Sequence, residues 1–249
     1  MKNRLLALLK QTSPLLVASL DGDDLPYLLE QARSDRADVV EIRLDVWGTF
    51  FREDMIEKMA RFKDKIGLPL LVSFRGGHPF PAWWQPVHWR ALSHADMIDV
   101  EWNPKYPWRD IVKNVKKYNL ALMISHHDYK ETPSEKTLAK IAKAAYGKKA
   151  DVVKFATKIQ KEDDIRTLLH LNEQFSPKRW MTVMGMGPMG TLSRLSAPLF
   201  KACLIYGFIG TPTASGQLPF RDLLERVRML YPRYDEAFQV RVARGMSVH

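Results

Sequence analysis

The sequence predicts a single-domain (β/α)8 barrel, and three observations lead to that fold class. Eight short apolar runs, rich in β-branched residues, recur along the chain. Their starts are separated by 23, 31, 28, 23, 31, 28 and 23 residues, and each interval holds a helix-like segment. The runs are almost continuously apolar, as expected of parallel strands that helices cover. A doubly wound open sheet is the alternative, but the count of eight and the near-even spacing favour the barrel.

The first four strands are predicted at "LLVASL" (15–20), "DVVEIRLD" (38–45), "PLLVSFR" (69–75) and "MIDVEW" (97–102). The second of these runs is unusual, because Glu41, Arg43 and Asp45 recur at period two and share one face of the strand. Charges on a strand face are costly to bury unless they are paired or functional. An arginine–carboxylate network that stabilises the barrel and a functional cluster both fit this pattern.

The last four strands are predicted at "LALMISHHD" (120–128), "DVVKFATK" (151–158), "RWMTVMGMG" (179–187) and "ACLIYGFIG" (202–210). The helix between the first two begins at "PSEK", where Ser134 is the predicted N-terminal cap. A last helix pattern covers 221–231. We therefore assign residues 1–232 to the barrel and 233–249 to a basic, partly disordered C-terminal tail.

Composition narrows the class of protein. The chain has 249 residues and a formal net charge of +10, but its basic residues are scattered rather than clustered with aromatics. That scatter favours a solvated surface that attracts a small anion over a nucleic-acid-binding face. A single cysteine, Cys203, excludes a disulfide framework and is predicted to be a core residue in a reducing compartment. No signal peptide or spanning segment is apparent, so we expect a cytoplasmic protein without a membrane partner.

Catalytic groups of a barrel lie at the C-terminal ends of its strands. The fifth strand ends in His126 and His127, and strand alternation lets only one of them face inward. The sixth strand carries Lys154 in an apolar run, where burial and nearby cations favour the neutral, nucleophilic amine. Pairing with Glu41 or Glu101 is the structural alternative for this lysine. Adjacent strands lie about 4.8 Å apart, so His127 and Lys154 can reach one substrate.

Glycine-rich turns follow the last two strands, "GMGPMGTLSR" and "GTPTASGQ". Turns at these positions build anion sites at helix N-termini, although a plain turn is also possible. Arg194 offers a bidentate partner for a carboxylate or phosphate, and Thr213 and Gln217 offer neutral groups. No metal site is expected, because the methionine-rich segment indicates packing and metal-ligand spacing is absent among the remaining histidines, such as His78, His88 and His94.

Taken together, these residues resemble the type I 3-dehydroquinate dehydratases. The order and spacing of the similar segments fit over residues 15 to about 230. The similar segments are "EIRLD" (41–45), "SFR" (73–75), "SHHDYKETP" (125–133), "DVVKFA" (151–156), "MGMGPMGTLSRL" (184–195) and "TASGQ" (213–217).

The resemblance implies a (β/α)8 barrel, usually dimeric and free of metal or added cofactor, that converts 3-dehydroquinate to 3-dehydroshikimate in the shikimate pathway. It implies that Lys154 forms a Schiff base with the substrate's C3 ketone and that His127 is the general acid and base. The implied substrate-binding residues are Ser19, Glu41, Arg43 and Arg75 on the hydroxyl side and Arg194, Thr213 and Gln217 at the carboxylate.

The chain departs from the family pattern at several places. The family usually has a glutamate a few residues after the third-strand arginine, but Arg75 is followed directly by "GGHPF". Either another group orients His127, such as Asp99 or Glu101, or activity is reduced. Thr213 replaces the usual serine and keeps the hydroxyl, while the aromatic segment 78–89 has no familiar counterpart. Two other functions remain open: a class I Schiff-base aldolase, and a catalytically silent barrel that binds an anion or nucleic acid.

Overall fold

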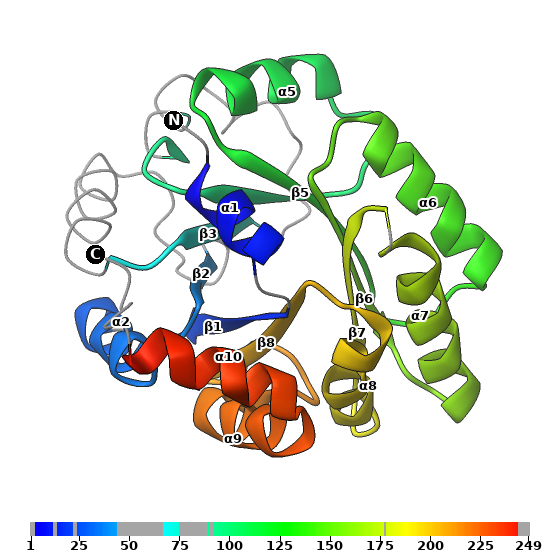
Figure 1. The fold of residues 1–249 in the computed structure, drawn as a ribbon. Coiled ribbons are helices and arrows are strands. Elements are labelled where there is room, and N and C mark those ends of the chain that lie inside the picture. The colour runs from blue at the N-terminus through cyan, green and yellow to red at the C-terminus, as the bar shows by residue number, and fades with distance from the viewer. Residues whose placement is uncertain are drawn as a thin grey trace.

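The computed structural model describes residues 3–11, 14–21, 24–43, 67–74, 89, 92–176 and 178–243. Within these ranges the strands form one parallel sheet in the order β7-β6-β5-β4-β3-β2-β1-β8-β9. The strands curl around a common centre, with helices along their outside (Figure 1). β7 meets β8 through hydrogen bonds from Cys203 N to Met181 O (2.9 Å) and from Thr182 Oγ1 to Leu204 O (2.6 Å). The (β/α)8 barrel predicted from the sequence is therefore confirmed.

All eight predicted strands are present. They are β1 (Leu15–Asp21), β2 (Val39–Arg43), β3 (Leu70–Phe74), β4 (Met97–Glu101), β5 (Ala121–Asp128), β6 (Val152–Lys158), β7 (Trp180–Met186) and β8 (Leu204–Gly210). The two-residue strand β9 (Leu218–Pro219) adds to β8.

The described helices are α1 (Arg4–Gln11), α2 (Leu25–Ser34), α5 (Trp108–Lys117), α6 (Glu135–Gly147), α7 (Glu162–Phe175), α8 (Gly190–Ser196), the 3-10 helix η1 (Ala197–Phe200), α9 (Phe220–Leu230) and α10 (Pro232–Ala243). The predicted cap of α6 is confirmed, because the Ser134 hydroxyl accepts a hydrogen bond from Thr137 N at 3.3 Å. Asp24 caps α2 in the same way, accepting from Tyr27 N at 3.1 Å.

Two apolar layers hold the barrel together. The outer layer lies between the strands and the surrounding helices, and the inner layer fills the barrel interior. Leu5 and Leu9 of α1 belong to the inner layer, so this helix covers the N-terminal end of the barrel, where Figure 1 shows it lying across the strands. Cys203 is buried in the same inner layer, as predicted. In the described part of the chain, no helix has the length and apolar character needed to cross a membrane.

The segment assigned to a C-terminal tail contains a helix that the sequence did not indicate. α10 packs against α9, where Tyr234 and Phe238 are buried in the outer apolar layer. The two helices also share a guanidinium–ring contact, with Arg228 4.7 Å from the centre of the Phe238 ring. Helical order thus continues to Ala243, and residues 244–249 lie outside the described part.

Candidate active site

The interior of the barrel changes from apolar to polar along its axis. Side chains alternate along each strand, so every second residue of a strand faces inward. Near the N-terminal ends these inward residues are apolar and contact α1. Towards the C-terminal ends they are buried polar groups: Ser19, Glu41, Arg43, Ser73, Asp99, Ser125, Lys154 and Thr182. This polar end is where the fold class places catalytic groups.

Lys154 is the most deeply buried charged residue of this set, with no exposed surface. Its Nζ lies 3.1 Å from Asp99 Oδ2 and 3.4 Å from Glu41 Oε1. The same nitrogen lies 4.2 Å from the centre of the Tyr206 ring, whose face attracts a cation. Two carboxylates and a ring face favour the ammonium form. The lysine must therefore pass a proton to a neighbour before its amine can attack a carbonyl group.

Glu41 links three strands of the site. It accepts hydrogen bonds from Ser19 Oγ at 2.6 Å and from Ser73 Oγ at 2.5 Å, and it contacts Lys154. These three donors satisfy a carboxylate that is 2% exposed. The predicted proximity of Ser19 and Glu41 is confirmed. Ser73 was not singled out in the sequence, although its inward position opposite Arg43 follows from strand register.

A carboxylate on the neighbouring strand holds His127. Its Nδ1 lies 2.5 Å from Glu101 Oε2, and its backbone N–H donates to Glu101 Oε1 at 2.9 Å. The imidazole is 3% exposed and stacks on the Tyr129 ring at 6.1 Å between centroids. A neutral imidazole that donates from Nδ1 uses the buried Nε2 as its proton acceptor. Glu101 thus has the orienting contact that the family pattern leaves open in this chain.

His126 points to the other face of β5. Its ring meets Phe155 of the outer apolar layer edge-on, at 6.2 Å between centroids. Burial lowers the pKa of His126 below its ordinary value, while the nearby Asp128 carboxylate acts in the opposite direction. This histidine therefore favours the neutral form, and the expected alternation, with one histidine inward and one outward, is present.

Two turns at the same end of the barrel bind each other. Gly187 N, after β7, donates to Ser215 O at 3.2 Å, and Thr191 Oγ1 donates to Gly216 O at 2.9 Å. Gly216 has φ +79°, and a Cβ at this position would lie 2.3 Å from Gly187 O. The close approach of the two turns therefore requires glycine.

The predicted anion-binding residues lie on these turns and the helix that follows them. Arg194 on α8 is 2% exposed, and its Nη1 lies 3.6 Å from the sulfur of Met184, an inner-layer residue of β7. Gln217 Oε1 accepts from both the backbone N–H (3.1 Å) and the hydroxyl (3.0 Å) of Thr213. That pairing leaves the Gln217 amide NH2 to act as a donor towards an anion.

Some predicted residues cannot be placed in this geometry. Arg43 is buried on the inward face of β2. Asp45, Arg75 and all but the last residue of the aromatic segment 78–89 lie outside the described residues. Among residues that the structure does describe, no group of three or more His, Cys, Asp or Glu side chains is suited to holding a metal ion.

Comparisons with known proteins agree with this geometry. The sequence model of the family described as type I 3-dehydroquinase matches residues 16–233. The 3-dehydroquinate dehydratase of Methanothrix thermoacetophila is 31% identical over 235 residues, covering 90% of this chain and 96% of the relative. That of Methanococcoides burtonii is 27% identical over 229 residues, covering 87% and 94%.

A solved structure shows the same fold. The type I 3-dehydroquinate dehydratase of Clostridium difficile, determined with covalently modified comenic acid, superposes with a TM-score of 0.79 at 23% identity. The match covers 88% of this chain and 93% of that one.

Proposed function

Because this chain belongs to the type I 3-dehydroquinase family, we propose that it eliminates water from 3-dehydroquinate through a Schiff base on Lys154. The activity is that of a hydro-lyase of the shikimate pathway, and the product is 3-dehydroshikimate. One observation carries the assignment of roles: the buried Lys154 amine and the His127–Glu101 pair project from adjacent strands into one polar end of the barrel. The family match favours this activity over an aldolase or a catalytically silent barrel.

Lys154 is the nucleophile in this proposal. Its proton passes to Asp99 or Glu41, and the free amine adds to the C3 carbonyl carbon of the substrate. Loss of the carbonyl oxygen as water leaves a protonated imine at C3. The cation is then held where the two carboxylates and the Tyr206 ring already favour positive charge.

His127 moves the protons of the elimination. Its Nε2 removes the C2 proton, and the electrons of that bond flow into the iminium to give an enamine. The resulting imidazolium protonates the C1 hydroxyl, which leaves as water while the C1–C2 double bond forms. Glu101 stabilises the imidazolium and keeps the ring in the required orientation. Hydrolysis of the imine then releases the product and regenerates Lys154.

The remaining residues are proposed to hold the substrate. Ser19, Glu41, Arg43 and Arg75 bind its hydroxyl side, and the carboxylate lies between Arg194, Thr213 and Gln217. The formal net charge of +10 favours the approach of this anion. A homodimer and a cytoplasmic location complete the proposal, and both rest on the family resemblance alone.

The decisive experiment is reductive trapping. Sodium borohydride added together with 3-dehydroquinate should inactivate the protein, and peptide mass spectrometry should find the added mass on Lys154. Lys158→Arg is the matched control, because Lys158 is the next lysine along β6 and should not carry the adduct. A protein that produces 3-dehydroshikimate but never carries the adduct on Lys154 would overturn the mechanism.

A further inference from the structure

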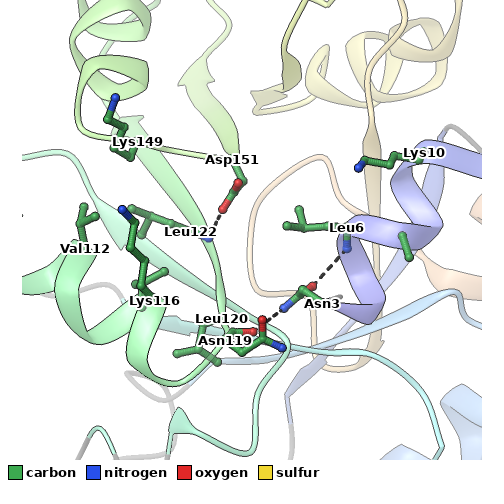
Figure 2. Close-up of a pocket in the computed structure, with 12 residues that line it drawn as sticks. Asn3, Leu6, Lys10, Val112, Lys116, Asn119, Leu120, Leu122, Lys149 and Asp151 are labelled. Atoms are coloured by element: carbon green, nitrogen blue, oxygen red, sulfur yellow. Dashed lines mark hydrogen bonds between the residues drawn. The ribbon is translucent and has the colours of Figure 1, made fainter. Parts of the chain in front are cut away.

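A second cavity lies at the opposite end of the barrel from the catalytic residues. Its volume is about 690 Å³, which lies within the range of small-molecule sites. Its walls come from α1, from α5 and from the segments that lead into β5 and β6 (Figure 2). β5 runs from the cavity residue Leu122 to His127, and β6 begins next to the cavity residue Asp151 and carries Lys154 beyond it. The cavity is therefore separate from the candidate active site.

Three lysines surround this cavity. Figure 2 shows Lys10 of α1 on one side and Lys116 and Lys149 on the other. Of the residues described, none places a carboxylate within ion-pair distance of these three ammonium groups. The single acid of the cavity wall is Asp151, and burial raises the pKa of its carboxyl above the ordinary value. The cavity therefore has an excess of positive charge.

The polar groups between the lysines are already used by the fold. Asn3 Nδ2 donates to Asp96 O at 2.6 Å and to Asn119 O at 2.9 Å, and Asn3 Oδ1 accepts from Leu6 N at 3.1 Å. Asp151 Oδ2 accepts from Leu122 N at 2.9 Å. Because these groups are satisfied, the lysines are the groups that remain to recognise a ligand.

The rest of the cavity surface is apolar. α1 contributes Leu6 from the face that does not cover the barrel, and the other apolar residues come from α5 and the approach to β5. They are Val112, Val115, Leu120 and Leu122. Such a surface gains free energy by covering a hydrocarbon ring or chain, and it offers nothing to a fully hydrated inorganic ion.

We propose that this cavity binds a small organic anion with an apolar body, of the aromatic carboxylate class. The carboxylate lies among Lys10, Lys116 and Lys149, and the ring lies on the leucine and valine surface. Ligands of this kind need both charge and an apolar contact, and the cavity wall provides the two side by side. The inference is independent of the Schiff-base chemistry, since it uses none of the catalytic residues.

The test is a calorimetric titration of the full chain with 2-naphthoate at low salt. We expect saturable one-to-one binding, weakened about tenfold or more in Lys116→Ala and in Lys149→Ala. Leu6→Trp, which places an indole in the cavity from the exposed side of α1, should abolish binding. Lys113→Ala and Lys148→Ala are matched controls, because each removes one exposed lysine close by that does not line the cavity.

Two further arms separate binding in this cavity from binding at the catalytic end and from simple attraction of anions to lysines. Arg194→Ala should bind 2-naphthoate as the unchanged protein does, whereas loss of binding would place the ligand at the catalytic end. Inorganic phosphate should bind at least tenfold more weakly than 2-naphthoate. Equal affinities for the two anions, equal effects of the test and control lysines, or no saturable binding would each overturn the proposal.

Discussion

At the scale of single residues, one carboxylate holds both the ring and the backbone of the proposed base. Glu101 accepts from His127 N through Oε1 and contacts His127 Nδ1 through Oε2. The two contacts fix the position and the tautomer of the imidazole together. Two residues earlier on β4, Asp99 makes the corresponding contact with Lys154. A single strand thus supplies partner carboxylates for both proposed catalytic groups.

Glu101→Gln should lower kcat by roughly 10² or more while leaving KM nearly unchanged. The substitution keeps the side-chain length but removes the charge that favours the imidazolium. For the same reason, the fall in kcat/KM on the acidic side should move to lower pH, because the ring becomes harder to protonate. Steady-state kinetics across pH measures both effects, with Glu131→Gln, an exposed change on the loop after β5, as the control. An unchanged kcat and pH profile would show that another group orients His127.

His126 should make the folded protein less stable below neutral pH. Burial lowers the pKa of His126 in the folded state, so the unfolded chain binds its proton first as the pH falls. The destabilising contribution is absent above the unfolded pKa, near 6.5, and grows as the pH falls towards the folded pKa. Urea unfolding from about pH 5 to about pH 7.5 should show a shallower dependence for His126→Gln. That variant should keep most turnover, and a steeper dependence would contradict the sign.

At the scale of elements, the strands were predictable and their mutual register was not. Apolar runs and their spacing identified all eight strands, because burial on both faces leaves a continuous signal. The sequence also identified the inward polar residues, but not which of them meet. Asp99 and Glu101 were equal candidates for His127, since both face inward on β4. Register decides between them: Glu101 pairs with Ser125, which brings it within reach of His127.

Two elements had no usable sequence signal. α1 is short, and "RLLALLKQ" does not say that Leu5 and Leu9 insert into the end of a barrel. α10 lies in a segment where charged and apolar positions are mixed, and its partner surface on α9 exists only in the folded chain. Helices whose stability comes from tertiary packing are the ones that local patterns miss.

Gly216→Ala tests the contact between the two turns that carry the proposed carboxylate site. The added Cβ meets Gly187 O, and the positive φ is unfavourable for alanine, so the turn must shift. We expect KM for 3-dehydroquinate to rise about tenfold, with stability lowered by roughly 1–2 kcal/mol. Gly147→Ala is the control, because no atom lies within 4 Å of a Cβ built there. A variant that loses stability without any rise in KM would separate this turn from substrate binding.

At the scale of the whole molecule, polarity divides the barrel along its axis. The C-terminal half holds buried, mutually paired charges, and the N-terminal half is apolar and covered by α1. The burial cost of the charged half must be offset elsewhere, and the outer layer of helices supplies much of the apolar burial. This division allows changes in the helix layer to alter stability without altering the catalytic geometry.

α10 provides the clearest test of that division. Tyr234 and Phe238 bury their rings against the outer layer, and the Tyr234 hydroxyl donates to Asp38 Oδ2 at 3.3 Å, next to the start of β2. Burial of two large aromatic side chains contributes a few kcal/mol at most, once compactness of the unfolded chain is considered. The double variant Tyr234→Ala and Phe238→Ala should therefore lose roughly 2–5 kcal/mol of unfolding free energy.

The same double variant should keep kcat and KM at temperatures where it remains folded, because α10 lies near the N-terminal ends of the strands and contacts none of the proposed catalytic residues. Denaturant unfolding and steady-state kinetics on one preparation measure the two quantities together. Val240→Ala is the matched control, since Val240 is exposed on the same helix and its loss should change neither. A fall in kcat in the folded double variant would mean that the helix layer and the polar end are coupled through the strands, contrary to the division of the barrel argued above.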